Sequence, residues 1–144
     1  MKEYSEPRMH TAEHILNQTM VRMFQHGRSF SSHIERKKSK CDYHMERDLT
    51  AAEITEIEER VNSIISANVP VTDEFINREA AAKLYSFERL PDDAGSTLRV
   101  VRVGDYDACL CSGKHVVSTG IIGKFKIISS SQNDGVLRIR FKLL

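Results

Sequence analysis

Apolar and polar residues follow one another along this chain with two different periods, one typical of helices and the other of strands. From residue 9 to about residue 25, apolar side chains recur every three or four positions, which predicts a helix with one apolar side. Ser5 is the expected cap of this helix. A second helical pattern runs from Thr50 to about residue 68, and Thr50 and Glu53 have the spacing of a capping box.

Shorter stretches carry the signals of strands. In residues 41–47 apolar and polar side chains alternate, which predicts a half-buried strand, and a basic hairpin tip separates it from a short segment at 29–35. Asp134 and Gly135 form a strong hairpin-turn signal between the last two strands. The other predicted strands are 69–77, 98–103, 121–129 and 136–143, with a short helix at 78–84.

The order of these elements predicts the fold class. Helices and strands do not alternate regularly, and the last strands are joined by short turns. This order is typical of an α+β fold with a mostly antiparallel sheet and helices packed on one face. Because 144 residues is the length of one ordinary domain and no linker interrupts the chain, we expect a single domain over residues 1–144.

Charge and cysteine usage exclude several classes of protein. Lysine and arginine number 21 and aspartate and glutamate 20, so the net charge of +1 excludes a uniformly basic nucleic-acid coat but leaves room for local basic patches. No stretch approaches the roughly 18 consecutive apolar residues of a membrane helix, and the first residues lack a secretory pattern. The odd set of Cys41, Cys109 and Cys111 fits reduced thiols or metal ligands, so we expect a cytoplasmic protein without a membrane partner.

Two histidine-containing pairs suggest a metal site. His10 and His14 are four residues apart on a predicted helix, so both side chains can reach one ion. Cys111 and His115 repeat this spacing in a glycine-containing turn. Three imidazoles and one thiolate fit zinc by softness and by number. Either pair alone arises by chance often enough that surface or buried structural roles stay open.

The segment from His10 to His14 also fits the HxxEH pattern of a class of metallopeptidases, with Glu13 as general base. This hypothesis requires a third, acidic ligand from a distant helix and a large peptide-binding chamber. A chain of 144 residues leaves little room for such a chamber.

The motifs together resemble a known family. The segment HTAEHIL at residues 10–16 resembles the opening motif of the editing domain of alanyl-tRNA synthetases and of their free-standing relatives, and the editing domain of threonyl-tRNA synthetases is related. The second motif of the family reads CGGTHV, followed by Thr-Gly, Ile-Gly and a C-terminal Arg-Ile strand. The corresponding residues here are CSGKHV at 111–116, Thr119-Gly120, Ile122-Gly123 and Arg138-Ile139. Segments between the motifs, at 59–62, 68–71 and 99–104, also look like the family.

This resemblance implies a fold, a reaction and a set of ligands. The fold would be that of a synthetase editing domain, and the chain is similar to the short free-standing type that acts in trans. The reaction would be deacylation of mischarged tRNA, with seryl- or glycyl-tRNA(Ala) as the first candidates. The resemblance makes His10, His14, Cys111 and His115 the ligands of zinc. A zinc-bound water is the expected catalyst, with Thr11, Glu13 and Lys114 as its neighbours; the protein would be a monomer or a homodimer.

The chain departs from the family in the second motif. Ser112 and Lys114 stand where the family has Gly and Thr. Ser112 adds a side chain at a position of close backbone approach, and Lys114 either disfavours a bound cation by repulsion, contacts a tRNA phosphate or is a solvated loop lysine. These departures keep open the alternative of a non-catalytic, zinc-stabilised RNA-binding or regulatory module of the same fold. Cys109 is expected to be a buried thiol, with an alternative ligand role open.

Contact with tRNA would have to come from local patches, because the net charge is only +1. The predicted tRNA-binding residues are Arg36, Lys37, Lys38 and Lys40 at the hairpin tip, with Lys124 and Lys126. Further cations at Arg138, Arg140 and Lys142 occupy alternate positions of the last strand and are expected to share one sheet face, which a solubilising surface would also explain.

Overall fold

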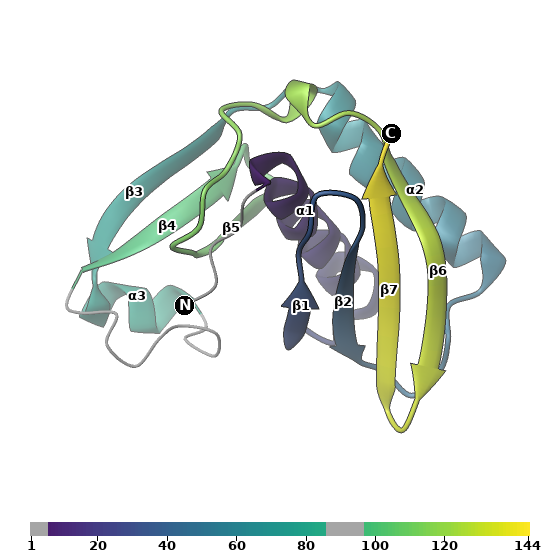
Figure 1. Cartoon of the computed structure of the whole chain (residues 1–144). Helices are drawn as coiled ribbons and strands as arrows, with labels where there is room; N and C mark the ends of the chain where they lie inside the picture. Colours follow the sequence, from purple (N-terminus) through teal and green to yellow (C-terminus); the bar gives the residue numbers. More distant parts are fainter. Residues whose placement is uncertain (1–5, 86–96) are drawn as a thin grey trace.

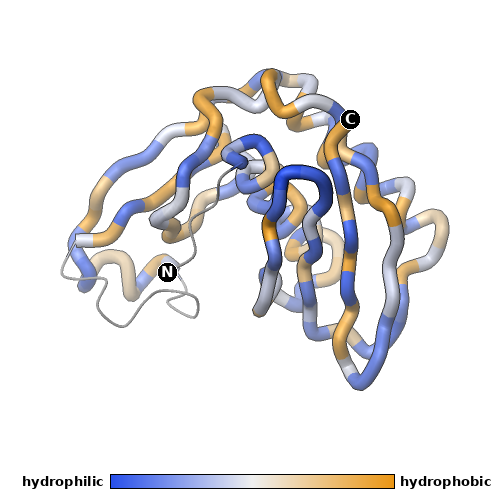
Figure 2. Tube along the Cα trace, viewed as in Figure 1, coloured by the Kyte–Doolittle hydropathy of each residue, from blue (hydrophilic) through white to orange (hydrophobic). Residues whose placement is uncertain are grey.

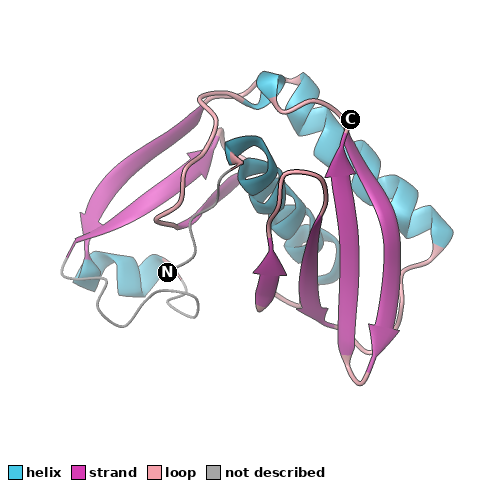
Figure 3. Ribbon diagram, in the orientation of Figure 1, coloured by secondary structure: helices cyan, strands magenta, loops and turns pink. Residues whose placement is uncertain are grey.

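Two antiparallel sheets and three α-helices make up the chain in the computed structural model, which describes residues 6–85 and 97–144 (Figures 1 and 3). One sheet has the strand order β1-β2-β7-β6 and the other the order β3-β4-β5. The predicted α+β class is confirmed, but the strands form two sheets instead of one. In chain order the elements are α1 (Pro7–Phe24), β1 (Ser31–His33), β2 (Ser39–His44), α2 (Ala51–Ser66), β3 (Val71–Asn77), α3 (Arg78–Leu84), β4 (Thr97–Val103), β5 (Asp107–Leu110), the 3₁₀ turn η1 (Thr119–Ile121), β6 (Phe125–Asn133) and β7 (Val136–Leu143).

The N-cap of helix α1 lies one residue later than the predicted cap. Glu6 is the N-cap, and its carboxylate accepts a hydrogen bond from the main-chain N–H of Arg8. Pro7 explains the shift, because proline is favoured at the first helical position and holds the residue before it in extended backbone. Ser5, the predicted cap, lies outside the described residues. The helix ends at Phe24, and within the described residues no helix is long and apolar enough to cross a membrane.

Helices α1 and α2 share one apolar core with the inner face of the four-stranded sheet. In β7 every second side chain is buried, so Leu137, Ile139 and Phe141 face the helices. Arg138 and Arg140 therefore point to the opposite face, as the alternating pattern predicts. Figure 1 shows α1 running between the four-stranded sheet and the β3-β4-β5 sheet. This position allows α1 to present polar side chains to the second sheet while its apolar residues complete the core.

Helix α2 is fixed at both ends by side chains. The predicted capping box is present, with Glu53 N–H donating to Thr50 and Thr50 N–H donating to the Glu53 carboxylate. In the middle of the helix, the amide of Asn62 accepts from the N–H of Phe125 at 2.8 Å and donates to its carbonyl at 2.9 Å. The helix ends at Ser66, two residues before the predicted end, and Asn68 follows in the left-handed conformation.

Strand limits differ from prediction where turns are set by distant contacts. Asp134 and Gly135 adopt left-handed backbone with φ of 50° and 77°, so the predicted β6–β7 hairpin turn is confirmed. Strand β6 starts at Phe125 and not at residue 121, because the chain first forms η1 and then turns at Gly123. The four residues of β5 were not predicted as a strand, because they carry no clear alternation of buried and exposed side chains.

Candidate metal centre

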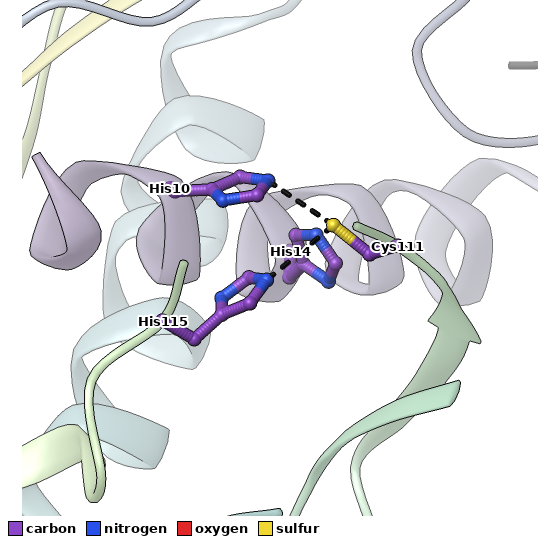
Figure 4. A group of neighbouring side chains, drawn as sticks. All are labelled: His10, His14, Cys111 and His115. Atoms are coloured by element: carbon purple, nitrogen blue, oxygen red, sulfur yellow. Dashed lines mark hydrogen bonds between the residues drawn. The ribbon is translucent and has the colours of Figure 1, made fainter. Parts of the chain in front are cut away.

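Helix α1 and the loop that follows β5 bring the four predicted metal-ligating residues together (Figure 4). The donor atoms of His10, His14, Cys111 and His115 all lie within 4.8 Å of one another. The two helix residues are buried, whereas Cys111 and His115 are half-buried. The cluster is therefore deep on the α1 side and reachable from solvent on the loop side.

Hydrogen bonds at the outer nitrogens orient two of the imidazoles. Nδ1 of His10 lies 3.0 Å from the carbonyl oxygen of Lys114, which can only accept, so this nitrogen carries the proton. Nδ1 of His115 lies 2.9 Å from the hydroxyl of Thr11, which already donates to the carbonyl of Pro7 and accepts from the N–H of Val116. Both rings are thus held with a protonated Nδ1, and their unprotonated Nε2 atoms face Cys111.

Two of the distances between the donor atoms fit a tetrahedral zinc ion. With Zn–N bonds of about 2.0–2.1 Å and a Zn–S bond of about 2.3 Å, sulfur and nitrogen ligands lie about 3.6 Å apart. Sγ of Cys111 lies 3.5 Å from Nε2 of His10 and 3.5 Å from Nε2 of His115. Two nitrogen lone pairs converge on a sulfur that has only one proton to share, so a cation satisfies this donor set better than a proton does.

The neighbours of Cys111 favour its thiolate. Burial alone would raise the pKa of the thiol, but contacts with His10, His115 and His14 lower the pKa of Cys111 to about 2. The main-chain N–H of Gly113 also donates to its sulfur at 3.4 Å. Burial, with the nearby His14 and His10, lowers the pKa of His115 to about 4 despite its contact with Cys111. A thiolate and a neutral imidazole are the protonation states that bind zinc.

A buried polar cluster supports His14 from the other side, and of its members only Cys109 was singled out in the sequence. Asp107 is fully buried and accepts from both terminal nitrogens of Arg28, at 2.6 and 3.2 Å, and from Gln18 at 2.9 Å. Its carboxylate lies 3.6 Å from Nδ1 of His14. Sγ of Cys109 lies 3.2 Å from the same nitrogen.

The charges in this cluster compensate one another. Burial would raise the pKa of Asp107, but His14 and Arg28 hold it well below its usual range. Burial would lower the pKa of His14, but Cys109 and Asp107 raise it well above its usual value. Cys109 is half-buried and not fully buried as expected, and it forms a second close group with His14 and Asp107. The cluster orients His14 through Nδ1, in the manner of the carboxylates that support zinc-binding histidines.

The loop that carries Cys111 and His115 is tied down along its length. Arg99 donates to the carbonyls of Cys111 and Gly113 and also pairs with Asp73 at 2.7 Å. Lys114 contributes its carbonyl to His10, while its side chain is exposed. The predicted repulsion between Lys114 and the ligand cluster therefore involves a side chain that extends into solvent.

The Thr-Gly motif fixes the far end of the same loop. The hydroxyl of Thr119 donates to the carbonyl of Ile64 at 2.8 Å and accepts from the N–H of Val69 at 3.0 Å. The N–H of Gly120 donates to the side chain of Asn68, and a Cβ at Gly120 would lie only 2.3 Å from that oxygen. These two residues anchor the loop to the end of α2 and leave no room for a larger residue at Gly120.

The two other predicted neighbours of the centre lie within α1. Thr11 is buried and acts on His115 through the hydrogen bond described above. Glu13 is also buried, and its carboxylate lies 3.7 Å from Nε2 of His10, the nitrogen that faces Cys111. Glu13 and the thiolate of Cys111 together supply two negative charges, which suits a divalent cation.

The cations predicted to contact tRNA gather around one end of the four-stranded sheet. Arg36, Lys37 and Lys38 lie in the turn between β1 and β2, and Lys40 lies in β2 itself. Lys126 lies in β6, and Lys124 directly precedes that strand. They are exposed or partly exposed.

Known proteins are similar to this chain in sequence. Residues 98–140 match the family described as "Threonyl and Alanyl tRNA synthetase second additional domain". This stretch runs from β4 into β7 and contains Cys111 and His115. The chain is similar to the editing region of alanyl-tRNA synthetases. The resemblance inferred from the sequence motifs is thereby confirmed.

Three alanine–tRNA ligases illustrate how far the similarity to these synthetases extends. The ligase of Fervidobacterium nodosum is 38% identical over 141 residues, which cover 96% of this chain and 16% of the ligase. That of Caldicellulosiruptor saccharolyticus is 36% identical over 132 residues, which cover 90% of this chain and 15% of the ligase. That of Methanococcus vannielii is 33% identical over 139 residues, which cover 93% of this chain and 16% of the ligase. The chain thus spans about 16% of the length of the curated relatives it matches.

Proposed function

We propose that this chain is a hydrolase that removes the amino acid from a mischarged tRNA at a zinc ion held by His10, His14, Cys111 and His115. The observation that carries the proposal is the convergence of these four donors, at distances that suit zinc, in a chain similar to the editing region of alanyl-tRNA synthetases. The first substrates are seryl- and glycyl-tRNA(Ala), released by a synthetase and hydrolysed in trans in the cytoplasm.

The reaction asks little of the protein, because an aminoacyl ester to a ribose hydroxyl is already activated. Zinc, when bound, supplies a Lewis acid for the ester carbonyl or lowers the pKa of water so that hydroxide is available near pH 7. His10 and His14 form the buried wall of the site, while the half-buried Cys111 and His115 face the side from which a substrate enters. Four protein ligands usually leave no position on zinc for water or substrate. If one of the four had to leave the ion, the half-buried Cys111 or His115 would be better placed to do so than the buried histidines.

Thr11 and Glu13 orient or stabilise the metal-binding side chains in the absence of substrate. The hydroxyl of Thr11 accepts the Nδ1 proton of His115 and so keeps Nε2 unprotonated toward Cys111. Glu13 places a carboxylate on the same side of His10 as Cys111. In this proposal the Glu13 carboxylate balances charge beside His10, and it is not the base on which the reaction depends.

The metallopeptidase hypothesis fits the structure less well. It requires two histidines and a distant acidic ligand, whereas the donors that join His10 and His14 are Cys111 and His115. Asp107, whose carboxylate lies 3.6 Å from Nδ1 of His14, has its oxygens engaged by Arg28 and Gln18.

The test is release of amino acid from a panel of purified esters by the chain alone. The panel holds seryl-, glycyl- and alanyl-tRNA(Ala) together with seryl-tRNA(Thr), and the zinc content of each preparation is measured. We expect chelator-sensitive release of serine or glycine and sparing of alanyl-tRNA(Ala), with loss of activity in His10→Ala and Cys111→Ala.

Substitution of Glu13 separates the two enzyme hypotheses. Glu13→Gln is expected to retain most of the deacylase activity, whereas a peptidase would lose its general base and orders of magnitude in rate. A folded, zinc-loaded protein that releases no amino acid from any ester would contradict the proposal. That result would favour the non-catalytic RNA-binding module.

A further inference from the structure

Like charges stand directly opposite each other on the outer face of the four-stranded sheet. Lys40 of β2 is the register partner of Arg140 in β7, and Lys126 of β6 is the partner of Lys142 in β7. Such cross-strand pairs of like charge destabilise a sheet. A face that served only solubility would mix both signs, so these pairs point to a ligand that supplies negative charge.

Two carboxylates beside these cations are already paired. Asp42 is held by Arg138 Nε at 2.8 Å and Arg138 Nη2 at 3.0 Å, and Glu35 in the turn between β1 and β2 pairs with Nε2 of His33 at 2.6 Å. The residues opposite Arg140 and Arg138 in β6 are Ser129 and Ser131, and the Ser129 hydroxyl accepts from Arg140 at 3.3 Å. Small hydroxyl side chains between the cations let a backbone of phosphates approach closely.

Further cations extend this face at one end of the sheet. Ser39 pairs with Phe141, and Phe125 pairs with Leu143, so the start of β2, the end of β7 and the start of β6 lie at the same end. The turn between β1 and β2 lies at this end, and Figure 2 shows it as a hydrophilic segment. We call the whole set the basic face: Arg36, Lys37, Lys38, Lys40, Lys124, Lys126, Arg140 and Lys142. Within the described part of the chain, none of the eight forms an ion pair.

The basic face reaches the entrance of the metal centre. Figure 1 shows the turn between β1 and β2 beside the first turn of α1, and Arg36 in this turn is close enough to the cap residue Glu6 to contribute, after Arg8, to lowering the pKa of Glu6. The N–H of His10 donates to the carbonyl of Glu6 at 3.1 Å, which places His10 one helical turn, about 5.4 Å, further along the axis. A polyanion lying on the basic face therefore ends close to the four donor residues.

We propose that the basic face binds the phosphate backbone of double-helical RNA, so that the stem of a tRNA lies across β6, β7 and β2 while its 3′ end enters the metal centre. None of the eight cations of the basic face or the serines beside them is aromatic, and the stacked rings of Phe30 and His44 lie at the other end of β2, where His44 pairs with Val136. Cations and hydroxyls suit a duplex, which proteins read through phosphates and 2′-hydroxyls, better than an unpaired strand, which needs stacking platforms. This inference rests on the proposed function for the identity of the RNA.

The test compares two double variants that remove the same charge. Lys126→Gln with Lys142→Gln removes one like-charged pair from the basic face. Arg60→Gln with Lys83→Gln removes two exposed cations from α2 and α3 as a control. The probe is an RNA hairpin with the sequence of a tRNA(Ala) acceptor stem and no attached amino acid. Its affinity for the protein is measured at several salt concentrations.

The basic-face variant should bind this hairpin about tenfold more weakly, with the salt slope reduced by about 2, because each lost phosphate contact lowers the slope by roughly 1. Its melting temperature should equal or exceed that of the wild type, because a like-charged pair has been relieved. The control variant should bind within about twofold of the wild type.

Two activity measurements separate this inference from the proposed function. The basic-face variant should hydrolyse an aminoacyl ester of adenosine, which has no stem, at the wild-type rate, while its rate on mischarged tRNA at limiting concentration falls about tenfold. Wild-type affinity and salt slope in this variant would overturn the inference even if hydrolysis is intact. Binding of phosphatidylserine vesicles that the RNA hairpin fails to displace would also overturn it. If the hairpin binds as expected but no ester is hydrolysed, the proposed function fails and the inference stands.

Discussion

Replacement of Thr11 by valine isolates the contribution of one hydroxyl to the metal centre. The Thr11 side chain is fully buried, and its hydroxyl makes three hydrogen bonds: it donates to the Pro7 carbonyl at 3.0 Å and accepts from Val116 N–H at 3.2 Å and from His115 at 2.9 Å. Valine has nearly the same shape, so the substitution removes the bonds with little change in packing.

The structure allows the size of the effect to be worked out. The N–H of Val116 is buried and loses its side-chain acceptor, which costs about 1–3 kcal/mol of unfolding free energy. His115 is half-buried, so its Nδ1–H can donate to water in place of Thr11. The loss of this hydrogen bond should therefore lower metal affinity rather than the unfolding free energy. Removing the partner that orients a metal-binding histidine typically lowers metal affinity by about 10–100-fold, or about 1.4–2.7 kcal/mol.

The assay is competition for zinc with a chelator of known affinity, alongside denaturant unfolding of the metal-free protein. Thr11→Ser is the matched control: it keeps the hydroxyl and loses one methyl group, so its zinc affinity should stay within about threefold of the wild type. Equal zinc affinities for folded Thr11→Val and Thr11→Ser would refute the argument that Thr11 orients His115.

Three further predictions concern stability. Asn62→Ala removes both hydrogen bonds to the main chain of β6, and its unfolding free energy in urea should fall by about 2 kcal/mol; an unchanged value would show that α2 is held by packing alone. The hydrogen bond from Arg47 lowers the pKa of Glu53 to about 2. The contribution of the Glu53 carboxylate to helix capping, about 0.5–1 kcal/mol, is therefore complete above pH 4.5 and lost toward pH 2. The difference in unfolding free energy between wild type and Glu53→Gln should shrink over that range, and a difference independent of pH would contradict this. Arg28→Met leaves the Asp107 carboxylate buried without its cation and should cost about 3–5 kcal/mol, much of it recovered when Asp107→Asn is added; equal losses in the single and double variants would contradict the pairing.

Features set by neighbouring residues were predicted well from the sequence. The capping box at Thr50 and the left-handed turn at Asp134 and Gly135 depend on contacts within a few residues, and both are present. The alternation in β7 also gave the correct face for Arg138 and Arg140, because a strand has a fixed period of two.

Features that depend on distant partners were missed. Arg28 and Asp107 are 79 residues apart, and neither stands out in the sequence before the fold brings them to His14. The division into two sheets has the same origin, because β4 and β5 pair with β3 and not with the strands of the other sheet. The four ligand candidates could be found because each pair lies four residues apart, and the resemblance joined the two pairs across the chain.

We propose that zinc bound by His10, His14, Cys111 and His115 supports deacylation. The most direct measurement is a titration of zinc into metal-free protein, with bound zinc and the rate of serine release from seryl-tRNA(Ala) followed in the same samples. We expect the rate to rise in proportion to bound zinc and to level off at one ion per chain, and we expect Cys111→Ala to show neither tight zinc binding nor this rise. A rate that is the same in metal-free and zinc-loaded protein would contradict it.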